Sequence, residues 1–259
     1  MSELRVVFTE TLDNPWMNLA WEEAFFQSRC SDKTGDVLRI WRNRNAVVIG
    51  VFQKASEEVN LEYAQQIRAG IVRRFTGGGA VYHDLGNINF ALSVKPVGRK
   101  VNVDYLYVDL LKGVVKALEK LGFNPSVQNV NDIIIGDRKV VGVAASLRRE
   151  QNCGFIHGAM LYNVNLDVLA GILKIPLKKL ADKGVSSVKY RVTNISALKP
   201  ELRVEDIVKA LIESFTETLD KKGWYPDLPK QHEIEMAERL YSSKYSTPEW
   251  NMERKRPEW

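Results

Sequence analysis

The chain has 259 residues, of which 45% are hydrophobic and 27% are charged. That length is sufficient for one large domain or two modest ones with a substantial buried core, and the composition is close to the average of globular proteins. No run approaches the roughly 20 consecutive apolar residues of a membrane-spanning helix, and residues 1–7 lack the basic stretch and apolar block of a secretory signal. The sequence therefore predicts a cytoplasmic protein with no membrane partner.

Basic residues slightly outnumber acidic ones, 37 to 32, for a formal net charge of +5. Such a surface can attract nucleic acid, an anionic cofactor or an acidic protein, and solvated charge of mixed sign is an equal alternative. No basic run is dense enough to predict a nucleic-acid-binding tail. Cys30 and Cys153 are the only cysteines, which argues against a disulfide framework and fits a reducing compartment.

Hydrophobic spacing predicts the elements of the first half of the chain. Residues 17–25 carry apolar side chains at helical spacing, so a short amphipathic helix is expected there. Two extended apolar runs, 37–41 and 46–52, are separated by turn residues, the pattern of a β-hairpin. Another strand is expected over residues 89–94.

The second half begins with a predicted helix. Asp104 is its expected cap, its apolar stripe runs over residues 110–121, and Gly122 ends it. Further extended runs follow at residues 133–135, 140–143 and 159–164, and a later helix is expected over residues 204–219. A strand-rich middle flanked by helices predicts the α+β class rather than βαβ alternation, arranged as one domain over residues 1–259.

The most informative stretch is 73–84, RRFTGGGAVYHD. Three successive glycines remove every side chain from a short piece of backbone, so a ligand can approach its N–H groups closely. The two preceding arginines have a fork geometry that suits carboxylate or phosphate; a glycine-rich turn with solvated arginines is the structural alternative. The stretch has neither Walker-loop nor dinucleotide-fingerprint spacing.

Read as a whole, the sequence resembles the lipoate–protein ligase family. The match spans residues 73–90 and recurs in collinear blocks along almost the entire chain: MNLAWEEA (17–24), VVIG (47–50), ND (131–132), GDRKVVG (136–142), GFIHG (154–158), VSSVKYRVTN (185–194) and KYSTPEWN (244–251). The implied fold is a mixed, largely antiparallel β-sheet flanked by helices, of the biotin/lipoate ligase catalytic-domain type.

The resemblance implies two successive reactions. Lipoate and Mg-ATP form lipoyl-adenylate, and a lysine amine of an acceptor domain then attacks the mixed anhydride, so ATP and Mg²⁺ are the expected cofactors. Carboxylate and triphosphate repel each other, so the first reaction needs fixed cations and N–H donors at the α-phosphate. The family places a catalytic lysine there, and Lys139 occupies that position.

The resemblance also implies the residues that border lipoate and ATP. They are Arg74, Thr76, Gly77, Gly78, Gly79, Ala80, His83, Asn87, Asp132, Phe155, His157 and Gly158. Asp132 is a candidate magnesium or ribose contact, because hard cations favour carboxylate oxygen, although an Asp after an Asn is also a common turn residue. His83 either contacts the ligand or is a structural histidine held by Asp84. Val81, Val143 and Ala145 are candidates for an apolar slot around the acyl tail.

Two other classes of function stay open. Octanoyltransferases carry the acyl group on a cysteine, and Cys153 lies four residues before His157, one residue farther than in one transferase class. Cys153 is therefore either a thioester nucleophile or an inert residue. A non-catalytic binder is the third class, and the intact glycine triplet and Lys139 argue against it.

The resemblance predicts protein partners as well. In longer family members an accessory C-terminal domain follows the block that ends at Asn251, whereas this chain ends at Trp259. We therefore expect a separate accessory subunit. The expected acceptors are lipoyl domains of 2-oxoacid dehydrogenase complexes or the H protein of the glycine cleavage system. Those domains are commonly acidic, so a basic ligase would favour encounter. No nucleic-acid partner is expected.

Overall fold

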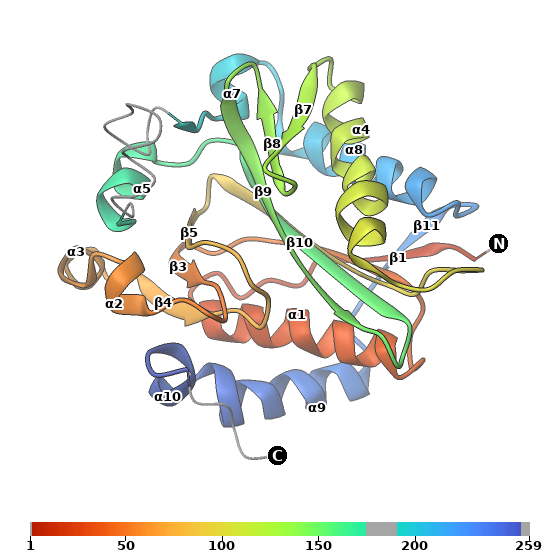
Figure 1. Ribbon diagram of the computed structural model, residues 1–259, viewed down its shortest axis with the longest axis horizontal. Helices are drawn as coiled ribbons and strands as arrows, with labels where there is room; N and C mark the ends of the chain where they lie inside the picture. The colour runs from red at the N-terminus through yellow and green to blue at the C-terminus, as the bar shows by residue number, and fades with distance from the viewer. Residues whose placement is uncertain (1, 175–190, 255–259) are drawn as a thin grey trace.

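The computed structural model describes residues 2–174 and 191–254 (Figure 1). Over these residues the strands form one sheet of eight strands and one of three. The α+β prediction is confirmed. Within the described ranges, no helix has both the length and the apolar character needed to cross a membrane.

The larger sheet contains the long β9–β10 hairpin at the centre of Figure 1. Its strands in spatial order are β11 (Trp224–Asp227), β1 (Leu4–Val7), β2 (Val37–Trp41), β6 (Asn87–Val94), β10 (Cys153–Leu161), β9 (Arg138–Arg148), β8 (Asp132–Ile135) and β7 (Pro125–Gln128). Only β1 pairs in parallel, with β11 and with β2, and the other pairings are antiparallel. The predicted mixed, largely antiparallel sheet is therefore confirmed.

The smaller sheet has the order β4 (Gly70–Arg73), β3 (Asn45–Ile49) and β5 (Val81–Asp84). The predicted hairpin of residues 37–41 with 46–52 is wrong, because these runs form β2 and β3 in different sheets. The connection between them contains Asn43, which is fully buried. Asn43 accepts a hydrogen bond from Asn18 at 2.8 Å and lies 3.2 Å from His83. These contacts hold the connection between the two sheets, so the chain does not fold back on itself as a β-hairpin.

Helices cover both faces of the larger sheet. On one face lie α4 (Leu111–Lys120) and α8 (Val204–Thr218), and the main apolar cluster fills the space between them and the strands. On the other face lies α1 (Pro15–Cys30), which packs against α9 (Gln231–Leu240) (Figure 1). The helices predicted over residues 17–25 and 204–219 are confirmed.

The α4 region begins differently from the prediction. A π-helical segment, η1 (Tyr105–Leu110), precedes α4, and Asp104 has helical dihedral angles with no capping bond. The Asn102 side chain accepts from the Tyr105 amide instead, at 2.8 Å. Gly122 follows α4 at a φ of +80°, as expected for a helix-ending glycine. The remaining helical segments are α2 (Ala55–Glu58), α3 (Leu61–Gln66), α5 (Leu166–Ile172), α7 (Ile195–Leu198), η3 (Tyr241–Tyr245) and α10 (Pro248–Asn251).

The alternation of side chains along the central strands separates core from site. On β6, Ile88, Phe90 and Leu92 enter the apolar cluster under α4 and α8. The intervening residues of a strand face the opposite side, so Asn89 and Ala91 point toward α1 and the smaller sheet. The candidate site lies on this second face.

Candidate active site

The glycine loop between β4 and β5 holds its carbonyl groups around one buried guanidinium. Arg74 donates to the Gly77 carbonyl at 3.0 and 2.6 Å and to the Gly79 carbonyl at 2.8 Å. Gly78 has a φ of +90°, and a Cβ there would lie 2.9 Å from the Arg74 guanidinium, so both backbone and space require glycine. The N–H groups of residues 77–79 donate to no other residue in the described part of the chain. Consecutive free N–H donors on a turn form a concave site for an anion.

Both arginines before the loop direct their guanidinium groups to backbone carbonyls. Arg73 is fully buried and donates to backbone carbonyls of Gly50, Val51, Gln53, Trp250 and Asn251. Burial lowers the pKa of Arg74 to about 10, so it stays charged at neutral pH. Both arginines therefore hold the loop in place, and Gly78 and Gly79 at its tip are exposed.

Lys139 lies beside Asp132 and directly over a glycine. Its ammonium is 2.5 Å from the Asp132 carboxylate, and the two side chains are 31% and 22% exposed. A Cβ on Gly142 would lie 2.7 Å from Lys139 Nζ, so the lysine occupies the space that a side chain would fill. Thr193 N–H donates to the Lys139 carbonyl at 3.0 Å, and Val192 bridges to Lys139. These contacts give residues 192–193 a structural role that the sequence left unassigned; residues 185–190 of the same block lie outside the described residues.

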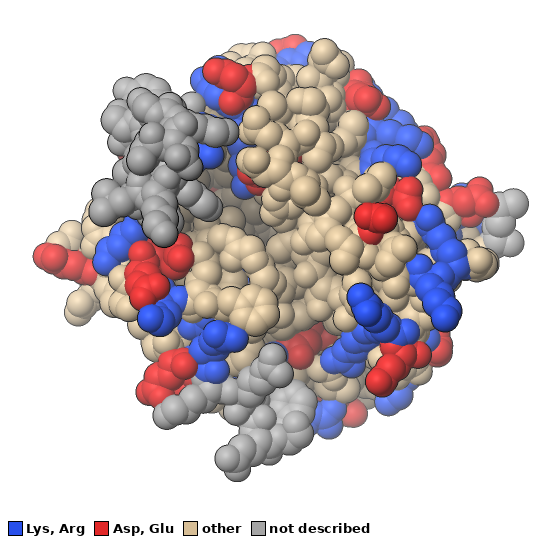
Figure 2. Space-filling model, viewed as in Figure 1, with Lys and Arg blue, Asp and Glu red and all other residues tan. Residues whose placement is uncertain are grey.

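The glycine loop and Lys139 lie over neighbouring positions of β9. A Cβ on Gly78 would be 3.8 Å from the Cβ of Ala144, and Ala144 shares a strand face with Gly142 two residues away. The cross-strand neighbours on β10 are His157 and Ala159. The strand positions beneath the loop and the lysine, Ala144, Gly142 and Ala159, are therefore all small residues. In Figure 2 the charged side chains lie mainly around the edge of this side of the molecule, and the centre carries few charges.

His157 connects the glycine loop to α1. Its Nε2 is 2.7 Å from Thr76 Oγ1, and its Nδ1 is 2.7 Å from the Glu22 carboxylate. Thr76 and Glu22 are 1% exposed, and His157 is 8% exposed. Thr76 and His157 are thus brought together, whereas Glu22 was missed by sequence reasoning. The signal that could have found it is the pair of acidic residues 22–23 in a helix whose other faces are apolar.

His83 is a buried residue with a partner other than the predicted one. Asn43 contacts its Nδ1, and the Asp84 carboxylate instead accepts from backbone amides. Burial, with a further contribution from His157 and Arg74, lowers the pKa of His83 to about 3, so the ring is neutral at physiological pH.

Other predicted residues divide between the two faces of the sheet. Asn87 accepts from the Asp84 amide at 2.8 Å and closes the β5–β6 turn. Phe155 is fully buried, in an aromatic cluster with Phe26 and Phe75. Gly158 does not border the site, because a Cβ there would lie 2.4 Å from the Phe90 ring in the core.

The residues of the predicted apolar slot lie on two sides of the larger sheet. Val143 and Ala145 pack in the core under α4 and α8. Val81, with the neighbouring Ala80, packs on the side of the smaller sheet.

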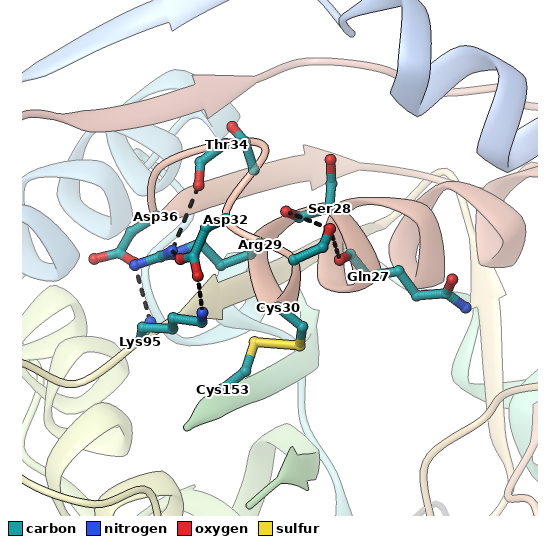
Figure 3. Close-up of a disulfide and its surroundings, with 10 residues drawn as sticks. Gln27, Ser28, Arg29, Cys30, Asp32, Thr34, Asp36, Lys95 and Cys153 are labelled. Atoms are coloured by element: carbon teal, nitrogen blue, oxygen red, sulfur yellow. Dashed lines mark hydrogen bonds and ion pairs between the residues drawn. A yellow bond between two sulfur atoms is a disulfide. The ribbon is translucent and has the colours of Figure 1, made fainter. Parts of the chain in front are cut away.

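The two cysteines form a disulfide, which corrects the prediction (Figure 3). The end of α1 lies against the start of β10, so Cys30 and Cys153 come within 5.3 Å between Cα atoms, a normal distance for a disulfide. Sequence could not reveal this because 123 positions separate them. Cys153 is also fully buried. It therefore has no free thiol to act as an acyl-transfer nucleophile.

The described residues contain no group of three or more His, Cys, Asp or Glu that could hold a metal ion. Asp132 is the acidic residue beside Lys139, and a single carboxylate fits the way Mg²⁺ is usually held, by one or two carboxylates together with substrate phosphates and water. The residues present therefore fit a magnesium ion that enters with a phosphate ligand, and they do not form a cage of protein ligands.

Comparison with known proteins identifies the family. The model of the lipoyl protein ligase A/B catalytic domain matches residues 14–216. The chain belongs to this family. Lipoate-protein ligase A subunit 1 of Thermoplasma acidophilum is 36% identical over 261 residues, which cover 96% of this chain and 97% of that protein.

Solved structures of this family share the fold over its whole length. A bipartite lipoate protein ligase and its E2 lipoyl domain from T. acidophilum gives a TM-score of 0.88 at 34% identity, covering 100% of this chain and 99% of the other. A lipoate-protein ligase A bound with ATP gives 0.85 at 32% identity, covering 97% and 99%. A T. acidophilum structure with bound lipoic acid gives 0.83 at 32% identity, covering 97% and 100%.

Proposed function

We propose that this chain is the catalytic domain of an ATP-dependent lipoate–protein ligase. The observation that carries the proposal is the placement of the free glycine-loop amides and the Lys139–Asp132 pair over adjacent positions of β9. Fixed N–H donors and an ammonium group at one place suit a reaction in which a carboxylate must approach a phosphate. Family membership and the relatives that bind ATP and lipoic acid support the same assignment.

In the first reaction, a carboxylate oxygen of lipoate attacks the α-phosphorus of ATP, and pyrophosphate leaves. The amides of residues 77–79 are suited to bind phosphate oxygens, and Lys139 is suited to neutralise the charge shared by carboxylate and phosphate. To do so, the ammonium must exchange part of its contact with Asp132 for the substrate. Asp132 would hold Mg²⁺, which neutralises phosphate charge when it is bound.

In the second reaction, the lysine amine of the acceptor attacks the carbonyl carbon of lipoyl-AMP and AMP leaves. The amine loses a proton as the amide forms. The proposed acceptors are lipoyl domains of 2-oxoacid dehydrogenase complexes or the H protein of glycine cleavage. A separate accessory subunit is proposed for efficient adenylation. The related T. acidophilum protein is described as subunit 1, and the related structure as bipartite, which supports this partner.

Intact mass of an apo lipoyl domain tests the assignment. The domain is incubated with this protein and either lipoate plus Mg-ATP or octanoyl carrier protein, each with and without the second subunit. We expect lipoylation that depends on ATP, survives Cys153→Ala and is reduced at least 100-fold by Lys139→Ala. Lys209→Ala is the matched control, because Lys209 is 75% exposed on α8, away from the site. ATP-independent octanoylation abolished by Cys153→Ala would establish a transferase instead.

A further inference from the structure

The carboxylate of Glu22 lies at the centre of a buried hydrogen-bond network that extends from Trp41 to Thr76, the residue before the glycine loop. One oxygen accepts from the Trp41 indole N–H at 3.1 Å, and the other contacts His157 Nδ1 at 2.7 Å. The Glu22 side chain itself is fully buried. It therefore cannot touch a substrate from its position in α1, and any effect on the reaction must pass through its partners.

For an ionised Glu22 carboxylate and a neutral His157 ring, these hydrogen bonds can run in only one direction. An ionised carboxylate only accepts hydrogen bonds, so His157 must carry a proton on Nδ1. In the neutral imidazole the other nitrogen is then an acceptor, and Thr76 donates its hydroxyl proton to it over 2.7 Å. The Thr76 carbonyl accepts from the Val51 amide at 2.9 Å, so side chain and backbone are both fixed immediately before Gly77.

Glu22 also reaches the loop through charge. Arg39 and Arg74 have buried guanidinium groups that donate to backbone carbonyls, and Arg39 also donates to the Asn18 side-chain oxygen. Burial lowers the pKa of Arg39 to about 9 and that of Arg74 to about 10, and in both cases the negative charge of Glu22 opposes the shift. Arg74 is the residue that holds the carbonyls of the glycine loop, and the negative charge of Glu22 favours its charged form.

We propose that Glu22 is a positioning residue for adenylation: through His157 and Thr76 it fixes the glycine loop with its amides toward the phosphate. This inference rests on the proposed ligase function, because it assigns a purpose to the fixed loop. It adds a contributor from α1 to a site otherwise built from β4, β5, β8, β9 and β10.

Glu22→Gln tests the proposal with almost no change in shape. Glutamine has one acceptor oxygen and one NH₂ group, whereas Trp41 and His157 both present N–H donors in the wild type. If the oxygen stays with Trp41, the NH₂ faces His157 and favours the tautomer with the proton on Nε2. That tautomer donates to Thr76, so the direction of the hydrogen bond is reversed and the negative charge of the carboxylate is lost.

The first measurements need no substrate. ¹⁵N NMR of the histidine rings should place the neutral His157 proton on Nδ1 in the wild type and on Nε2 in Glu22→Gln. Hydrogen exchange of the peptide spanning residues 74–80 should be faster in the variant, with little change in α8. Glu62→Gln is the matched control, because Glu62 lies exposed on α3. An unchanged tautomer together with unchanged loop exchange would overturn the proposal.

The kinetic measurement is kcat/KM for lipoyl-AMP formation. Glu22→Gln should lower it about 10- to 100-fold, as expected for loss of one charge-assisted hydrogen bond. Thr76→Ser, which keeps the hydroxyl, should lose less than Thr76→Val. A tautomer change with wild-type kcat/KM would refute the positioning role. If the wild type forms no lipoyl-AMP at all, the ligase assignment fails, while the NMR and exchange results still decide whether Glu22 orders the loop.

Discussion

Removing the Cys30–Cys153 disulfide tests how α1 is held against β10. The disulfide and the Glu22–His157 contact join the same two elements. Glu22 and Cys30 are eight residues apart, about 12 Å along a helix. Cys153 and His157 are four residues apart, about 13 Å along a strand. The two connections are therefore matched in spacing.

The size of the effect follows from the length of the closed loop. The disulfide joins residues 123 positions apart. In the chain-entropy model, closing a loop of that length restricts the unfolded chain and stabilises the folded state by about 5 kcal/mol at 25 °C. With a guanidinium m-value of about 5 kcal/mol/M, the unfolding midpoint should fall by roughly 1 M when the bond is lost.

Equilibrium unfolding in guanidinium chloride, with and without a phosphine reductant, measures this directly. Reductant acts on the bond alone and keeps both sulfur atoms in the core. The Cys30→Ala/Cys153→Ala variant removes the sulfur atoms too, so it should be at least as destabilised as the reduced wild type. The reductant should leave the variant unchanged, which makes the variant the control for any direct effect of the reductant.

Two results would refute the reasoning. Alkylation of the unreduced, denatured protein at both cysteines would mean that the bond does not form. A midpoint that is the same with and without reductant, in protein that alkylation proves to be oxidised, would mean that the bond does not restrict the unfolded chain.

Three further substitutions test contacts around the loop and the lysine. Gly142→Ala places a Cβ 2.7 Å from Lys139 Nζ, so it should displace the ammonium group. We expect lipoyl-AMP formation to fall at least 10-fold with little change in the unfolding midpoint. Unchanged kinetics would contradict the placement of the lysine. Gly50→Ala places a Cβ 2.1 Å from the Gly78 carbonyl oxygen. Thermal unfolding should therefore report a decrease of about 2–4 kcal/mol in the free energy of unfolding. A stable, fully active variant would contradict the close approach of these backbones. Arg73→Lys retains the charge but lacks the planar guanidinium that donates to several backbone carbonyls. Urea unfolding should report a decrease of about 2–3 kcal/mol in the free energy of unfolding. An unchanged midpoint would rule out a structural role for the guanidinium.

The sequence by itself determined the fold class and the family, and it predicted a set of site residues. Apolar spacing predicted α1, α8, β6 and the β9–β10 region correctly, because local periodicity reports which face of an element is buried. The glycine triplet predicted an accessible backbone, and the resemblance predicted Lys139 and its neighbours. The predictions of helices and strands succeed because each depends on residues that lie close together along the chain.

The tertiary structure alone decided the partners of those residues. Whether residues 37–41 pair with residues 46–52 depends on a buried asparagine between the layers, and local pattern carries no information about that contact. The same holds for Arg73 and Arg74, whose guanidinium groups donate to backbone carbonyls, and for Cys30, which forms a disulfide with a cysteine 123 residues away. Glu22 acquires its proposed role only when α1 packs on β10, because hydrogen bonds form between atoms that are close in space, and sequence separation does not constrain them.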